Sequence, residues 1–338
     1  MLSDQEIRIV VGQELPEWRK NRQRPPIQLN YPLTFIFRES DLKNLGEIED
    51  LLSAIAEIPE TDFPSLRKQA AIIEACTLGR HDNHRLGVGH YEREELFGEL
   101  VPPASALNSP RLKARNRYFA RQDFIGKSRD RYTVEDILNL HAAIHKGFGE
   151  IDAARHAEAI EKNSAKVEVN NHHTGMLRRD NLHPFTDDSG NITLLPPVYD
   201  LVETFLGDTL SWINDEETPK KNPIVENPIV KAIVGSYMFY APQPLPSGNT
   251  AVKRILYEDI LMNGGCDLRG IVSLAQPITY ASMEEVYVYN GKDMVTGEVR
   301  LDEYIKIMGQ HLAESLKLAL RRSQQVQVPY LNEGGLTV

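Results

Sequence analysis

Residues 243–254 read Gln-Pro-Leu-Pro-Ser-Gly-Asn-Thr-Ala-Val-Lys-Arg, and this stretch joins two apolar helical segments. A run of prolines stops the first segment, and the second begins near Thr250. A Ser-Gly-Asn turn that opens a helix directs free backbone N–H groups at one point, beside the positive end of the helix dipole. The stretch therefore predicts either a phosphate site or an ordinary helix joint capped by Ser247 or Asn249.

The bulk composition excludes several classes of protein. The 338 residues are 41% hydrophobic and 25% charged, which is typical of one large or two moderate soluble domains. No apolar run has the length of a membrane span and no secretory signal is evident, so we expect a cytoplasmic protein with no membrane partner; export by a signal-independent route stays open. The net charge of −10 argues against a nucleic-acid partner, and Arg178-Arg179 is interpreted as solvated surface.

The chain offers no pattern that predicts a metal site. Cys76 and Cys266 stand alone, and each is interpreted as a small buried residue. The adjacent His172 and His173 would point to different faces of any regular element, so they are poor ligands for one ion.

Hydrophobic spacing divides the chain into four parts. Residues 1–39 are polar and proline-interrupted and predict an arm, whereas residues 40–110 show the period of a helical region. Residues 111–322 are mostly helical, and residues 323–338 are interpreted as a tail. Helices are expected near 42–58, 64–78, 133–147, 198–213, 229–239 and 301–320. One turn cluster lies between two short segments that can pair as a hairpin: Asp187, Asp188, Ser189 and Gly190. The sequence thus predicts a mainly α protein with one small β-hairpin.

The order of these parts is similar to the Fic (Fido) family, whose best-known members are adenylyltransferases that move AMP from ATP onto a protein hydroxyl (AMPylation). The family pattern is His-Pro-Phe-x-(Asp/Glu)-Gly-Asn-Gly-Arg-x-x-Arg, and here Pro244, Gly248, Asn249 and Arg254 match it. The flanks agree as well: Pro196-Pro197 before a helix that ends Ser211-Trp212-Ile213-Asn214, and Asn227-Pro228 at the start of the helix before the loop. The resemblance covers about residues 110–322 and implies a Fic-like helical fold with a β-hairpin flap and an N-terminal helical extension. It also implies that the flap, at the turn cluster, clamps a protein partner by strand addition.

Four positions depart from the family pattern. Gln243 stands where the family carries its histidine base, and an amide does not titrate near neutral pH. Ser247 replaces the acidic residue that helps to hold magnesium, Thr250 replaces a glycine, and Ala251 removes the first arginine. The resemblance therefore implies a cradle for ATP or another nucleotide, with weak or absent magnesium binding and no catalytic base. The residues of this cradle are Ser247, Gly248, Asn249, Thr250 and Arg254.

Two other stretches resemble family signatures in part. His183-Pro184-Phe185-Thr186-Asp187 begins like the catalytic pattern, but the residues after it are extended and proline-stopped, so the flap is the favoured interpretation. Residues 70–75 resemble the family's inhibitory helix, in which Glu74 would pair with Arg254. An ordinary exposed glutamate is the alternative and the favoured interpretation of Glu74.

Three functions stay open at this point. The first is a catalytically impaired Fic-fold protein, a pseudoenzyme that binds a nucleotide or a protein as a regulator. The second is an active nucleotidyl or phosphoryl transferase with a non-standard base. The third is a protein-interaction module that uses no nucleotide. The loss of four chemically distinct positions in one motif favours the first and third over the second.

Overall fold

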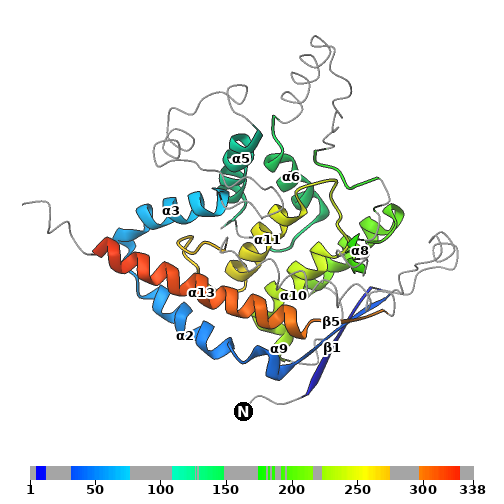
Figure 1. The fold of residues 1–338 in the computed structure, drawn as a ribbon, viewed down its shortest axis with the longest axis horizontal. Coiled ribbons are helices and arrows are strands. Elements are labelled where there is room, and N and C mark those ends of the chain that lie inside the picture. Colours follow the sequence, from blue (N-terminus) through cyan, green and yellow to red (C-terminus); the bar gives the residue numbers. More distant parts are fainter. Residues whose placement is uncertain are drawn as a thin grey trace, which may run out of the picture.

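Helices α10 (Pro228–Tyr240) and α11 (Asn249–Asn263) form the centre of the fold, and other helices pack around this pair (Figure 1). The computed structural model describes residues 5–12, 32–76, 109–125, 127, 129–147, 174–179, 182, 185–186, 192–194, 196–215, 223–274 and 297–327. Helix α10 is buried around most of its circumference because nearly every residue from Ile229 to Phe239 is apolar or small. Asn227 caps it, since its Oδ1 accepts from the Ile229 N–H at 2.9 Å. The predicted central helix is therefore confirmed.

Two further helices contact each member of this pair. Helix α8 (Tyr199–Ile213) packs on α10, and the short α9 (Pro223–Glu226) precedes α10. Helices α5 (Ser109–Phe124) and α6 (Val134–Ile144) contact α11. The start of α6 is a capping box, because the Asp136 N–H donates to Thr133 Oγ1 at 3.1 Å and the Thr133 N–H donates to Asp136 Oδ2 at 2.8 Å.

Buried ion pairs join α11 to α5 and to the residues after it. Arg121 donates to both carboxylate oxygens of Glu258, and the bond from its Nε is 2.9 Å long. Arg129 donates to Asp259 at 2.7 Å, and its guanidinium lies 3.7 Å from the centroid of the Phe124 ring. These pairs fix the rotation of α11 about its axis, because a buried charge without its partner is costly.

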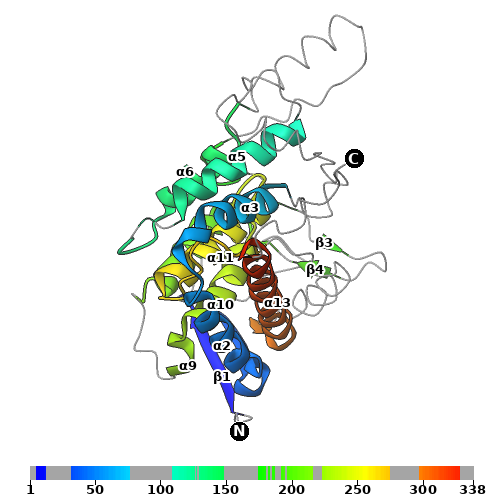
Figure 2. The same ribbon diagram turned by 90° about the vertical axis from the view of Figure 1, so that its left-hand side faces the viewer.

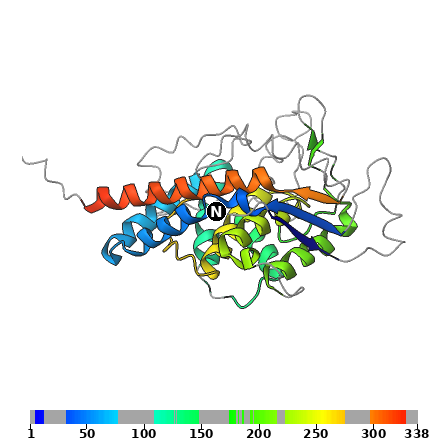
Figure 3. The same cartoon turned by 90° about the horizontal axis from the view of Figure 1, so that it is seen from below.

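The N-terminal helices pack along the C-terminal one. The order is η1 (Glu39–Leu42), α2 (Leu45–Ala56), η2 (Glu60–Asp62) and α3 (Phe63–Cys76). Helix α13 (Asp302–Gln327) lies beside α2, as Figures 1 and 3 both show. The predictions of helices at 42–58, 64–78 and 301–320 are confirmed within a few residues, and α13 extends further than expected. None of the described helices is long and apolar enough to cross a membrane.

A three-stranded sheet corrects the prediction for the start of the chain. Strands β1 (Glu6–Val11) and β2 (Leu33–Arg38) pair antiparallel, and β5 (Glu298–Arg300) adds to β2 in parallel, in the order β1-β2-β5. Alternate residues of β1 are buried, whereas four of the six residues of β2 are buried, three of them in a row. The interpretation of residues 1–39 as a polar arm is therefore wrong for these two strands. The prediction of a single hairpin also missed this sheet.

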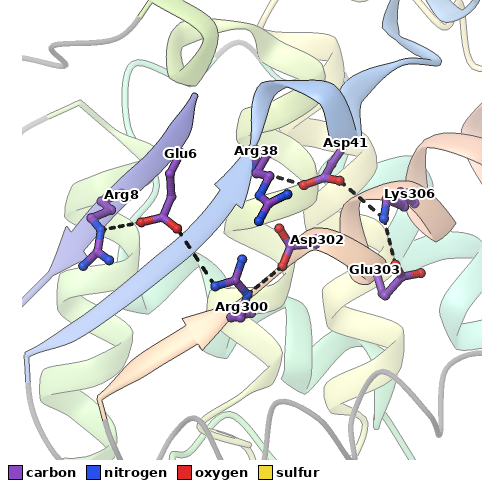
Figure 4. Close-up of polar contacts among 8 residues, drawn as sticks. All are labelled: Glu6, Arg8, Arg38, Asp41, Arg300, Asp302, Glu303 and Lys306. Atoms are coloured by element: carbon purple, nitrogen blue, oxygen red, sulfur yellow. Dashed lines mark hydrogen bonds and ion pairs between the residues drawn. The ribbon is translucent and has the colours of Figure 1, made fainter. Parts of the chain in front are cut away.

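Charged side chains link this sheet to α13 (Figure 4). Glu6 lies 4.0 Å from Arg300, whose Nε donates to Asp302 at 3.0 Å. Lys306 on the next turn of α13 lies 3.4 Å from Asp41. Burial, followed by a hydrogen bond with Asp41, raises the pKa of Asp302. Most of these groups are partly exposed, so the network orients the sheet more than it stabilises it.

The predicted hairpin is present as a second, two-stranded sheet. Strands β3 (Phe185–Thr186) and β4 (Ile192–Leu194) pair antiparallel. Figure 2 shows this pair to one side of the helices. The turn cluster of Asp187, Asp188, Ser189 and Gly190 lies outside the described residues.

Candidate functional site

The loop between α10 and α11, residues 241–248, holds Gln243 in a fixed and strained position. Gln243 has φ of 46°, in the left-handed region that costs a non-glycine residue about 1–2 kcal/mol. Its side chain is buried, and both its backbone N–H and its Nε2 donate to the Tyr240 carbonyl at 3.0 Å. The amide of Gln243 therefore closes the end of α10, and it offers no group that accepts a proton near neutral pH.

Arg178 is the residue that holds the loop in this conformation. Its Nε donates to the Gln243 carbonyl at 2.8 Å, and its Nη2 donates to the carbonyls of Pro242, at 3.2 Å, and Pro197. Its backbone N–H donates to the Pro244 carbonyl at 2.9 Å. Prolines lack an N–H but keep their carbonyls, so this loop has surplus acceptors that a guanidinium can satisfy. The interpretation of Arg178 as solvated surface is wrong, because only 4% of this residue is exposed.

Asn249 also serves the loop itself. Its Oδ1 accepts from the Leu245 N–H at 3.0 Å, and its Nδ2 donates to the Leu245 carbonyl at 2.9 Å. The sequence predicted Asn249 either as a helix cap or as a phosphate ligand. The N-cap of α11 is instead Gly248, and no side chain caps this helix. The first intrahelical bond runs from Val252 N–H to the Gly248 carbonyl at 3.0 Å, so the earlier N–H groups of α11 have no acceptor within the helix.

His145, at the C-terminal end of α6, contacts the loop at Ser247. Its Nε2 lies 3.0 Å from Ser247 Oγ, and its Nδ1 lies 3.0 Å from the His141 carbonyl. A Cβ added to Gly248 would lie 2.5 Å from His145 Cε1, and Gly248 has φ of 71°. Glycine is therefore required at this position for two reasons, the close approach of the imidazole and the left-handed backbone. Sequence reasoning did not single out His145.

The charges beside the loop are cationic. Lys253 is buried, with Nζ 4.6 Å from the centroid of the Tyr240 ring. Burial, followed by the charge of Arg254, lowers the pKa of Lys253 to about 7. Arg254 is half-buried and Thr250 is exposed. Residues 243–254 contain no Asp or Glu. This donor set suits an anion and offers no carboxylate to a magnesium ion.

Two predicted site features are described only in part. Glu74 lies on α3, but its side chain is outside the described residues, so its pairing with Arg254 stays a prediction. Strands β3 and β4 have the antiparallel pairing expected of the flap, while the turn between them is outside the described residues.

Cys266 is buried as predicted, and burial raises the pKa of its thiol to about 11. Among the described residues, no three His, Cys, Asp or Glu side chains come together as a metal site.

The fold that presents this loop is that of Fic-family proteins. No protein-family model matches the chain, and no curated protein matches its sequence. A Fic family protein from Desulfovibrio desulfuricans G20 is similar in structure, with a TM-score of 0.57 and 16% identity, over 90% of this chain and 79% of that chain. A Fic domain containing signaling protein from Bacteroides thetaiotaomicron VPI-5482 has a TM-score of 0.56 and 14% identity, over 83% of this chain and 98% of that one.

A variant of Fic-1 from C. elegans has a similar fold as well, with a TM-score of 0.54 and 15% identity, over 83% of this chain and 72% of that chain. The predicted Fic-like fold is confirmed by these likenesses. At such low identities they concern the fold alone, so the chemistry depends on the residues of the loop.

Proposed function

We propose that this protein is a Fic-fold regulator that binds an anionic ligand, foremost a nucleotide phosphate, at the N-terminus of α11. We further propose that it does not transfer AMP by the route of the family. The observation that carries this proposal is the state of Gln243. It stands at the position of the family's base, and its amide is held on the Tyr240 carbonyl instead of facing a reacting group.

Anion binding is supported by three features of the loop. The first N–H groups of α11 lack acceptors in the helix, and the positive end of the helix dipole lies there. Arg254 lies one turn further along, and Lys253 adds a cation when it is protonated. The bonds from Arg178 and Asn249 keep the loop in shape without a ligand, so little ordering entropy opposes binding.

Calorimetry of the full chain with ATP, ADP and GTP, with and without magnesium, tests nucleotide binding. We expect binding that changes little when magnesium is removed, because the loop has no carboxylate. Arg254→Gln should weaken binding about tenfold or more, since a hydrogen bond to a charged group contributes about 1.5–3 kcal/mol. The exposed Arg179→Gln is the matched control and should bind as the wild type does. If no nucleotide binds, this proposal is wrong and a protein-interaction module remains.

Transfer of labelled AMP tests the impaired chemistry. Gln243→His alone should not create transfer, because Thr250 and Ala251 still lack the glycine and the arginine of the family pattern. Labelling of a protein target by the wild type, abolished in Gln243→Ala, would contradict the proposal. One observation favours the alternative of a transferase with a different base, namely the imidazole of His145 beside the loop.

Whether or not the protein is a transferase, we propose that strands β3 and β4 receive an extended segment of a protein partner.

A further inference from the structure

Ser247 and His145 form a hydroxyl–imidazole pair that the family pattern does not contain. Ser247 Oγ and His145 Nε2 are 3.0 Å apart, although the two residues are 102 positions apart in the chain. Ser247 is partly exposed, whereas only 6% of His145 is exposed. The pair therefore combines an accessible hydroxyl with an imidazole that is held inside the protein.

The hydrogen bonds of His145 determine which nitrogen carries the proton in the neutral ring. The His141 carbonyl can only accept, so His145 Nδ1 must carry the hydrogen in this bond of 3.0 Å. Nε2 then carries the lone pair of the ring, and this lone pair accepts the hydrogen of the Ser247 hydroxyl. This is the order of bonds that a nucleophile, its base and a group that orients the base require.

The start of α11, next to Ser247, supplies the remaining part of an acyl-transfer site, which is a set of donors to the oxyanion. Ser247 immediately precedes Gly248, and α11 begins at the next residue. The first N–H groups of α11 have no acceptor within the helix, so they can donate to a negative oxygen that forms near Ser247 Oγ. The imidazole ring of His145 is packed closely against Gly248 and lies 4.4 Å from the His141 ring, measured between centroids.

We infer that Ser247 is a nucleophile, with His145 as its general base, that reacts with small activated acyl esters. Ser247 Oγ bonds to the carbonyl carbon, its proton passes to His145 Nε2, and the carbonyl electron pair moves to the oxygen. When the C–O bond to the leaving group breaks, the leaving alkoxide takes the proton from Nε2 and departs as an alcohol. Water then attacks the acyl carbon while His145 Nε2 takes its proton. When the bond from that carbon to Ser247 Oγ breaks, Oγ takes the proton from Nε2 and the carboxylic acid departs.

Acylation of Ser247 is an activity beyond that of the proposed regulator, and it does not depend on nucleotide binding. The test is the reaction of the full chain, without nucleotide, with p-nitrophenyl acetate. We expect a burst of p-nitrophenolate equal to the protein present, and peptide mass spectrometry should find the acetyl group on Ser247. Ser247→Ala should abolish the burst, and His145→Gln should slow acylation about 100-fold or more, which is the usual contribution of a general base. Ser53→Ala, at an exposed serine of α2, is the matched control and should react as the wild type does.

The wild-type protein provides a second test that does not require a buried residue to be replaced. The acylation rate should level off once the imidazole is neutral, instead of rising about tenfold with each pH unit as attack by hydroxide does. A burst that survives in Ser247→Ala, acetylation at another residue, or no burst at all would overturn the inference. None of these outcomes is a test of nucleotide binding, which calorimetry measures separately. The two proposals can therefore fail independently.

Discussion

Replacing Lys253 with methionine should stabilise the folded protein, and the gain should depend on pH. Only 8% of Lys253 is exposed, and burial lowers its pKa from 10.5 to about 7, with a further contribution from Arg254. Methionine has a similar length and no charge, so it fills the same space beside the rings of Tyr240 and Tyr304 without a buried ammonium group. The variant therefore removes the cost of desolvating a cation.

The expected gain in stability of the Lys253 variant can be calculated from the pKa shift of Lys253. Each pKa unit corresponds to about 1.4 kcal/mol, so the shift from 10.5 to about 7 is a cost of at most about 5 kcal/mol. Attraction of the ammonium to the Tyr240 ring, worth about 1–2 kcal/mol, acts in the opposite sense. We expect the free energy of unfolding to rise by about 3 kcal/mol at about pH 6 and below, where Lys253 is charged in both the folded and the unfolded state. Above pH 7 the unfolded chain binds more protons at this site than the folded chain, so wild-type stability rises and the difference narrows.

Urea unfolding of both proteins at several values between about pH 6 and pH 9 measures this difference. The gain of the variant should fall by on the order of 1–2 kcal/mol over the upper part of that range. Lys127→Met, at an exposed lysine, is the control and should leave both stability and its pH dependence almost unchanged. Stability curves of the Lys253 variant and the wild type that run parallel across the range would refute the reasoning.

Three further substitutions test the framework of the loop by thermal or urea unfolding. Gly248→Ala should cost about 2–4 kcal/mol, because its Cβ would lie 2.5 Å from the neighbouring imidazole and φ is 71°; Gly46→Ala, in open space on a helix, should be neutral or stabilising by contrast. Arg178→Lys keeps the charge but loses the fork that binds several carbonyls, so we expect a loss of about 2 kcal/mol and faster proteolysis of the loop. Glu258→Gln leaves Arg121 buried beside a neutral amide and should cost about 3–5 kcal/mol; a loss below about 1 kcal/mol would show that the pair is not buried in solution.

The helical part of the fold could be predicted because its signals are local. The apolar run of α10, the capping box of α6 and the prolines before α8 each act within a few residues of the chain. The sheet could not be predicted in the same way. Strand β2 pairs with β1 across a polar segment and with β5 from near the far end of the chain, and such pairing leaves no local trace beyond short apolar runs.

The position of the site in the chain could be predicted, but the side chains that contact it could not. The sequence located the loop and identified Gly248, because a turn before a helix has a recognisable composition. It did not predict the roles of Arg178 and His145, because both come from distant segments. One signal was available, since a loop rich in proline carries carbonyls that need a buried donor from elsewhere.

Nucleotide binding and acylation of Ser247 would both use the first N–H groups of α11. A phosphate oxygen and the oxyanion of an acylation step would both accept from the first N–H groups of α11. A bound phosphate also brings negative charge near Lys253 and favours its protonated form, which opposes the effect of burial. An anion at this helix end should therefore compete with acylation of Ser247 and take up protons near pH 7 as it binds. An acylation rate that is unchanged when a nucleotide is bound would mean that the nucleotide occupies a different part of the fold.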